Sequence, residues 1–152
     1  MHHRCKRRRG AWTLSLHLAL FGLTFATGAL AADLTVYKRP TCGCCKKWVD
    51  HMRAAGFTVT VNDVKSVEPV KREHAVPPGM ASCHTALVEG YVVEGHVPVD
   101  VVQRLLKERP KVSGIAVPGM PMGSPGMEGP RQDSYEIYTF DADGHTAVYE
   151  RR

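Results

Sequence analysis

The sequence lacks an excess of either charge once its first 31 residues are set aside. The full chain of 152 residues carries 20 Lys+Arg and 15 Asp+Glu. Five of the basic residues and none of the acidic ones fall within residues 1–31, so the rest of the chain holds 15 of each sign. This balance leaves no electrostatic argument for a nucleic-acid partner, and none is expected. Internal repeats are also missing, and the chain length predicts a single domain.

Acidic residues are missing from the N-terminal segment altogether. There, a basic stretch (residues 3–9) precedes residues 11–30, which are apolar and contain no Lys, Arg, Asp or Glu. The segment ends in Ala29-Leu30-Ala31, an A-x-A cleavage signal. This pattern predicts a secretory signal peptide over residues 1–31 and a periplasmic domain over residues 32–152 that is not embedded in the membrane. The alternative is an uncleaved anchor, because the run is near the length that spans a bilayer.

Cysteine is scarce beyond that leader, and its spacing does not suit a structural framework. The remaining cysteines are Cys42, Cys44, Cys45 and Cys83. A disulfide between Cys42 and Cys45 would close too small a loop to stabilise the fold much. About 120 residues can bury an adequate core without disulfides. We therefore interpret these cysteines as functional.

Hydrophobic periodicity and turn residues divide the domain into short strands and helices. The expected strands are residues 34–37, 57–61, 85–88, 91–93, 135–140 and 146–149. The expected helices are residues 43–55, 63–75 and 99–108, and residues 114–129 are expected to form a long Gly/Pro/Met loop. The order β-α-β-α-β-β-α with an added C-terminal β-hairpin predicts an α/β, thioredoxin-like mixed sheet.

The cysteine motif in residues 41–48, Thr-Cys-Gly-Cys-Cys-Lys-Lys-Trp, allows two interpretations. Cys42 and Cys45 have the C-x-x-C spacing of a redox dithiol, and the motif resembles the Cys-Gly-Pro-Cys-Lys of thioredoxins with Cys44 in the place of proline. Three thiolates on a tight turn also suit a thiophilic metal. A helix N-terminus lowers the pKa of a thiol, which serves both chemistries, so the motif alone leaves both open.

Three other features favour a metal site. Cys44 adds a thiol where a redox motif holds an inert residue. Cys83 and His84 precede the third strand. Ser82 and Cys83 align with the cis-proline of thioredoxins and the residue after it, a position that faces the cysteine motif. Met120 and Met122 belong to a loop without a core pattern, and thioethers together with thiolates favour Cu(I).

Four stretches together resemble one protein family. They are residues 41–45, residues 82–85, residues 90–98 and residues 117–127. They are similar to the CopG-type metal-binding proteins, once catalogued only as a domain of unknown function. The resemblance implies a periplasmic thioredoxin-like fold that binds copper and serves copper resistance. By position it implies the ligands Cys42, Cys44, Cys45 and Cys83, which could bridge several Cu(I) ions in a small cluster.

The roles of the neighbouring side chains stay open. His84 is either a ligand or a hydrogen-bond partner of the motif. Met120 and Met122 are either ligands or gap-fillers under a folded loop. His96 is expected to be a turn residue, with a ligand role as the alternative, and Trp48 is expected in the core.

The sequence thus predicts a metal-binding protein that captures Cu(I) for copper resistance or homeostasis, with electron transfer at the bound copper as an expected extension. Periplasmic copper exporters or oxidases are the expected protein partners. The alternative is a thiol–disulfide oxidoreductase that uses Cys42 and Cys45, and a structural zinc site is a third interpretation.

Overall fold

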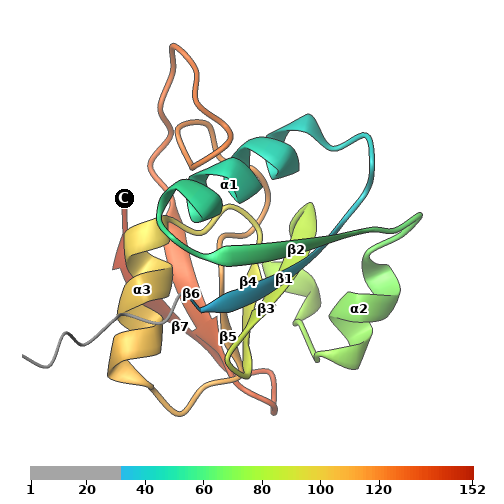
Figure 1. Ribbon diagram of the computed structural model, residues 1–152. Helices are drawn as coiled ribbons and strands as arrows, with labels where there is room; N and C mark the ends of the chain where they lie inside the picture. The colour runs from blue at the N-terminus through green and yellow to red at the C-terminus, as the bar shows by residue number, and fades with distance from the viewer. Residues whose placement is uncertain (1–31) are drawn as a thin grey trace, which may run out of the picture.

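The structure is a computed structural model and describes residues 32–152; the expected leader lies outside the described residues. Seven strands form one mixed sheet in the order β2-β1-β3-β4-β5-β6-β7 (Figure 1). The strands are β1 (Asp33–Lys38), β2 (Thr58–Asp63), β3 (His84–Val88), β4 (Tyr91–Glu94), β5 (Gly114–Ala116), β6 (Glu136–Phe140) and β7 (Thr146–Arg151). The helices are α1 (Gly43–Ala54), α2 (Glu68–Glu73), the short 3-10 helix η1 (Pro78–Met80) and α3 (Val99–Glu108).

The first four strands confirm the expected thioredoxin-like order. Strand β1 runs parallel to β2 and antiparallel to β3, and β3 pairs antiparallel with β4. The α1 crossover between β1 and β2 places the helix N-terminus at the end of β1, beside the start of β3. The cysteine motif therefore starts at the C-terminal end of β1, next to the first residues of β3. No helix in residues 32–152 has the length and apolar character needed to cross a bilayer.

The β3–β4 hairpin sets the register around the site. Glu89 and Gly90 have φ values of +45° and +87°, the two positive φ values of a two-residue hairpin turn. This turn pairs Thr85 with Glu94 across the two strands. The conformation of this turn thus sets which residues of β3 and β4 lie opposite each other near the cysteine motif.

Two sequence expectations are wrong. The helix expected over residues 63–75 shrinks to α2, because Asp63 continues β2 opposite Lys38 and the helix begins only at Glu68. The loop expected from residue 114 begins with strand β5, which pairs with β4 on one side and β6 on the other. This three-residue strand is too short to leave a periodic signal, yet it joins the C-terminal hairpin to the main sheet.

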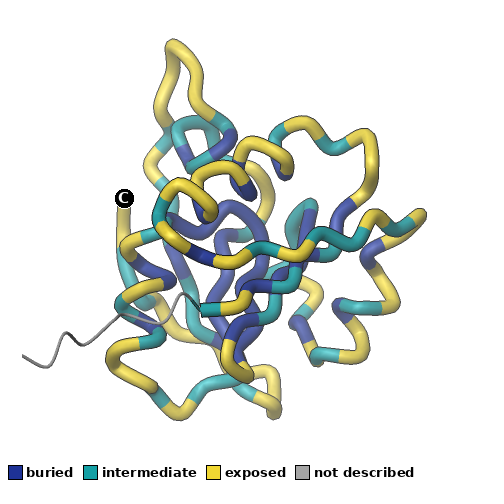
Figure 2. The backbone as a smooth tube through the Cα atoms, viewed as in Figure 1, coloured by how far each residue is buried: buried dark blue, intermediate teal, exposed yellow. Residues whose placement is uncertain are grey.

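The sheet separates two hydrophobic cores. Figure 2 shows the buried residues gathered in the middle of the molecule, along the central strands. The larger core packs α1 and α3 against the sheet and includes the fully buried Trp48 and Met52. The smaller core includes Val92 and Phe140. Val92 and its neighbour Val93 belong to different cores, because successive strand residues point to opposite faces. The expected core role of Trp48 is confirmed, and its Nε1 donates a hydrogen bond to the Val97 carbonyl at 2.9 Å.

Candidate metal centre

The cysteine motif lies at the N-terminus of α1, as the sequence predicts. Cys42 is the N-cap residue, and its Sγ accepts a hydrogen bond from the backbone amide of Cys45 at 3.4 Å. The unpaired amides and positive end of the helix dipole favour negative charge at this position. Cys45 itself is fully buried, whereas Cys44 is half-buried. The motif therefore spans from the surface into the protein interior.

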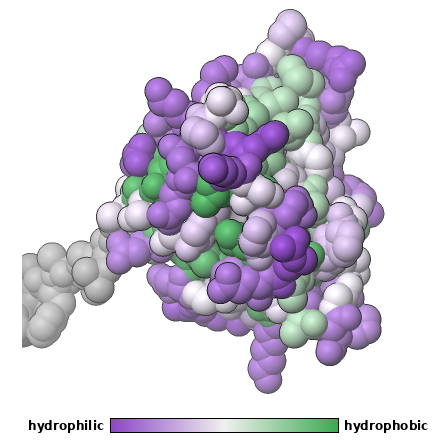
Figure 3. Space-filling view, turned by 90° about the vertical axis from the view of Figure 1, so that its right-hand side faces the viewer, coloured by the Kyte–Doolittle hydropathy of each residue, from purple (hydrophilic) through white to green (hydrophobic). Residues whose placement is uncertain are grey.

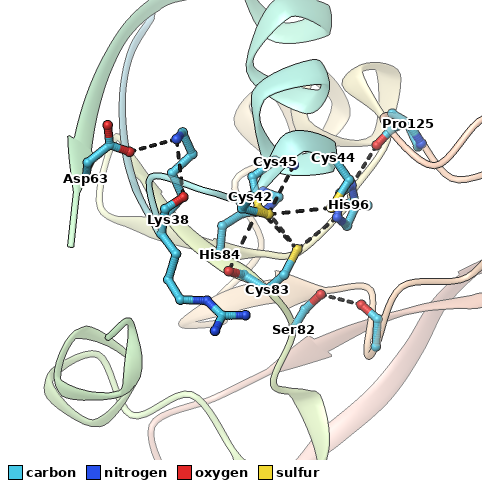
Figure 4. Close-up of a disulfide and its surroundings, with 12 residues drawn as sticks. Lys38, Cys42, Cys44, Cys45, Asp63, Ser82, Cys83, His84, His96 and Pro125 are labelled. Atoms are coloured by element: carbon cyan, nitrogen blue, oxygen red, sulfur yellow. Dashed lines mark hydrogen bonds and ion pairs between the residues drawn. A yellow bond between two sulfur atoms is a disulfide. The ribbon is translucent and has the colours of Figure 1, made fainter. Parts of the chain in front are cut away.

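The fold brings the distant cysteine to this motif (Figure 4). The Sγ atoms of Cys45 and Cys83 are 3.4 Å apart, and those of Cys42 and Cys44 are 3.5 Å apart. The four sulfur atoms all lie within 4.8 Å of one another. The position of Cys83 opposite the motif, expected from the hairpin, is thus confirmed.

The structure joins Cys42 and Cys45 in a disulfide. Cys44 and Cys83 are the free cysteines of the described part of the chain. A disulfide sulfur has no thiolate charge to offer a metal ion. Ligation by all four sulfurs therefore requires reduction of this disulfide by two electrons.

Two buried imidazoles lie beside the sulfur cluster. His84 is fully buried between Trp48 and His96, with ring centroids 4.4 Å and 5.1 Å away. Its Nδ1 lies 3.5 Å from the Sγ of Cys83, and its Nε2 has no hydrogen-bond partner in the structure. An unpaired buried nitrogen is costly, and a metal ion is one partner that would satisfy it.

His96 is the site residue that the sequence interpretation missed. Its Nε2 lies 2.9 Å from the Sγ of Cys83. Its Nδ1 lies 2.7 Å from the carbonyl oxygen of Pro125 and must donate, because a carbonyl only accepts. The lone pair of His96 therefore faces Cys83. The hairpin register could have identified His96 from the sequence. A turn at Glu89-Gly90 that pairs residue 85 with residue 94 places residue 83 opposite residue 96.

Burial favours the neutral forms of Cys83, His84 and His96. Burial and the neighbouring Cys44 raise the pKa of the Cys83 thiol to about 12. Burial, followed by the nearby His96, lowers the pKa of His84 well below its usual value. Burial also lowers the pKa of His96. The site thus offers neutral nitrogen lone pairs, and the Cys83 thiol would ionise readily only beside a cation.

The expected methionine ligands lie in a loop that covers the site. We call residues 117–130 the strap. The side chain of Met120 is 52% exposed, so the structure does not bury it among the cysteines. Met122 is half-buried, and its terminal methyl packs against Gly129. The strap therefore holds neither thioether in a buried ligand position.

Backbone contacts hold the strap over the cysteine motif. A Cβ at Gly126 would lie 2.5 Å from the carbonyl oxygen of Cys44 and 3.0 Å from the amide nitrogen of Trp48. Only glycine permits this approach, and its φ of +89° also favours glycine. The adjacent Pro125 carbonyl accepts the hydrogen bond from His96. The strap is thereby fixed to both α1 and the buried histidine.

Gly126→Ala is expected to lower the free energy of unfolding by about 1–3 kcal/mol, because the new methyl group clashes with the backbone of α1. Chemical denaturation of both proteins measures the difference. Gly144→Ala is the matched control: Gly144 has a φ of +82°, but a Cβ there meets nothing within 4 Å. Equal losses in the two variants would show that backbone strain alone acts and that the strap is not closely packed on the motif.

A buried ion pair fixes the backbone that carries Cys83. Lys71 of α2 pairs with Glu94 of β4, and both side chains are almost fully buried. Glu94 also accepts hydrogen bonds from the backbone amide of Ser82 at 2.6 Å and from the Thr85 hydroxyl at 2.7 Å. These hydrogen bonds hold the chain before and after Cys83. Burial raises the pKa of Glu94, and its contacts with Lys71, Thr85 and the Ser82 amide oppose that rise.

A protein family shares the part of the chain that contains Cys83. A family model described as "Protein of unknown function, DUF411" matches residues 80–127, which include Cys83, both buried histidines and most of the strap. No curated protein matches the chain.

Solved structures extend the similarity to the whole domain. Two structures named "Copper resistance protein copG", Form 1 and Form 2, each match with a TM-score of 0.76 and 42% sequence identity. Each match covers 80% of this chain and 98% of the other. Identity at this level over most of the domain shows common descent, and the chain belongs to the CopG family of copper resistance proteins.

Proposed function

We propose that this protein captures Cu(I) through Cys42, Cys44, Cys45 and Cys83 and so contributes to copper resistance or homeostasis. The observation that carries the proposal is the convergence of four cysteine sulfurs within 4.8 Å. Thiolates select Cu(I) over hard cations. Sulfur atoms this close can each bridge two ions, which supports a small multinuclear cluster. Copper is the cargo, and the fold has its own cores without it.

The buried histidines fit the same cargo. His84 has an unpaired Nε2, and His96 presents a lone pair toward Cys83. Neutral imidazole is a good ligand for copper. We include both in the proposed ligand environment and keep Met120 and Met122 as proposed capture ligands on the strap. The exposure of Met120 suits a first contact with incoming Cu(I).

The proposed setting is the periplasm, reached through a signal peptide over residues 1–31. The disulfide between Cys42 and Cys45 is consistent with an oxidising compartment. Copper exporters or oxidases of that compartment are the proposed recipients. Electron transfer at the bound copper remains part of the proposal.

Cys83→Ser tests the ligand set directly. The reduced protein is loaded anaerobically with Cu(I), freed of excess metal and analysed for bound copper. We expect the variant to hold at least one ion fewer than the wild type, because serine oxygen is a poor ligand for Cu(I). Asp141→Asn is the control, since Asp141, Asp143 and His145 form a separate exposed group of ligand atoms. An unchanged count in Cys83→Ser, or a wild type that binds no Cu(I), contradicts the proposal.

A second candidate function is thiol–disulfide exchange. It is favoured by the disulfide itself, with the free Cys83 thiol 3.4 Å from the sulfur of Cys45. An insulin-reduction assay separates the two functions. If the wild type binds no Cu(I) but reduces insulin, and a Cys44→Ser/Cys83→Ser variant retains that activity, then Cys42 and Cys45 act as a redox pair.

A further inference from the structure

A cavity of about 300 Å³ opens beside Cys83. Its walls come from the turn after β1, the segment between β2 and α2, and the residues just before β3. Arg39, Lys65, Ser66 and Ser82 line it together with Cys83. These elements lie on the side of the molecule that Figure 3 turns toward the viewer, where hydrophilic residues predominate. The volume is at the lower end of the range for small-molecule sites, so the cavity suits a small solute.

The cavity carries unpaired positive charge. Within residues 32–152, neither Arg39 nor Lys65 forms an ion pair, whereas the adjacent Lys38 pairs with Asp63 at 2.7 Å. Glu68 is the acidic residue lining the cavity, so the lining has one net positive charge. The Ser66 hydroxyl beside these cations adds a hydrogen-bond donor, whereas the Ser82 hydroxyl already donates to the Gly119 carbonyl. The chemistry matches a small anion, with carboxylates as its binding groups.

We propose that this cavity receives a small anionic Cu(I)–thiolate complex, whose donor is a carboxylate-bearing thiol, and passes its ion to Cys83. The inference rests on the proposed copper function. In the exchange, a Cu–S bond to Cys83 forms and one Cu–S bond to the donor breaks. The departing donor thiolate takes the proton that Cys83 releases, and copper stays Cu(I). Arg39 and Lys65 act by holding the carboxylates of the donor while the sulfurs exchange.

The charge preference of the cavity can be measured without copper. A protein carrying Cys5→Ser and Cys44→Ser, with the disulfide intact, has Cys83 as its free thiol. Anionic and cationic methanethiosulfonates each convert that thiol to a mixed disulfide and release methanesulfinate. Adding Arg39→Gln and Lys65→Gln is expected to lower the anionic-to-cationic rate ratio about tenfold at low salt, because two nearby positive charges act oppositely on the two reagents.

The matched control removes the same charge elsewhere. Lys107→Gln and Lys111→Gln, on and just after α3, line no part of this cavity and should change the ratio by less than about twofold. Equal ratios in both double variants would overturn the inference, because the positive charges at the cavity would then have no local effect on Cys83.

A copper experiment distinguishes this inference from the proposed function. The transfer rate of Cu(I) to the reduced protein is compared for two donors, glutathione with carboxylates and 2-mercaptoethanol without them. We expect the Arg39→Gln/Lys65→Gln variant to lose about fivefold in rate with glutathione and little with 2-mercaptoethanol. Rapid loading at equal rates from both donors in all variants overturns the docking role and leaves copper binding intact. No loading of the wild type from either donor overturns the copper function itself.

Discussion

Replacing Lys71 with methionine is expected to lower the free energy of unfolding by about 3–5 kcal/mol, the cost of leaving a buried partner charge uncompensated. Lys71 and Glu94 are 3% and 0% exposed, so no water can take over the role of the missing ammonium. Glu94 would then protonate or draw water into the smaller core. Either change loosens the hydrogen bond from Glu94 to the amide of Ser82, the residue before Cys83. Urea denaturation measures the loss.

A double-variant cycle tests the cause. Lys71→Met combined with Glu94→Leu removes both charges and is expected to recover most of the lost stability, since a buried ion pair can be replaced by apolar groups at little cost. Lys38→Met is the matched control, because the partner of Lys38, Asp63, is 53% exposed and can rehydrate. That variant should lose only about 0–1 kcal/mol. A similar loss for both single variants would show that the burial of Glu94 is not what matters.

Keeping the Cys42–Cys45 disulfide intact is expected to reduce Cu(I) binding to roughly half or less of that of the reduced protein, because two of the four thiolates are withdrawn. Protein samples with and without prior dithiol reduction are loaded anaerobically with Cu(I). Bound copper and free thiols are then counted in the same samples. The copper count should rise in step with the two thiols released.

The Cys42→Ser/Cys45→Ser variant controls for other effects of the reductant. It has no disulfide to open, so reduction should leave its low copper count unchanged. If the oxidised wild type binds as much Cu(I) as the reduced protein, the ligand set must exclude Cys42 and Cys45. Copper would then be held by Cys83 with the buried histidines, whose ligand atoms also lie within 4.8 Å of one another.

Local signals in the sequence were enough to predict much of the fold. Helix α3 was expected over residues 99–108, and the structure places it at Val99–Glu108. The signals for this helix are its apolar stripe and its flanking prolines, and both can be identified from a short stretch of sequence. The three-residue β5 gave no such signal, because its strand character comes from pairing with β4 and β6. The length of α2 also had no local signal, because it depends on where β2 stops pairing with β1.

Residue types and spacing were enough to identify the two halves of the candidate site: three cysteines at a helix start and Cys83 before a hairpin. Their soft, charge-bearing sulfurs favour a thiophilic metal wherever they meet. Three arrangements became visible only in the folded chain: His96 faces Cys83, the strap closes over Cys44, and two unpaired cations line the cavity beside Cys83. These arrangements join residues far apart in the chain, and their distances follow from strand register and backbone packing, which no short stretch of sequence fixes.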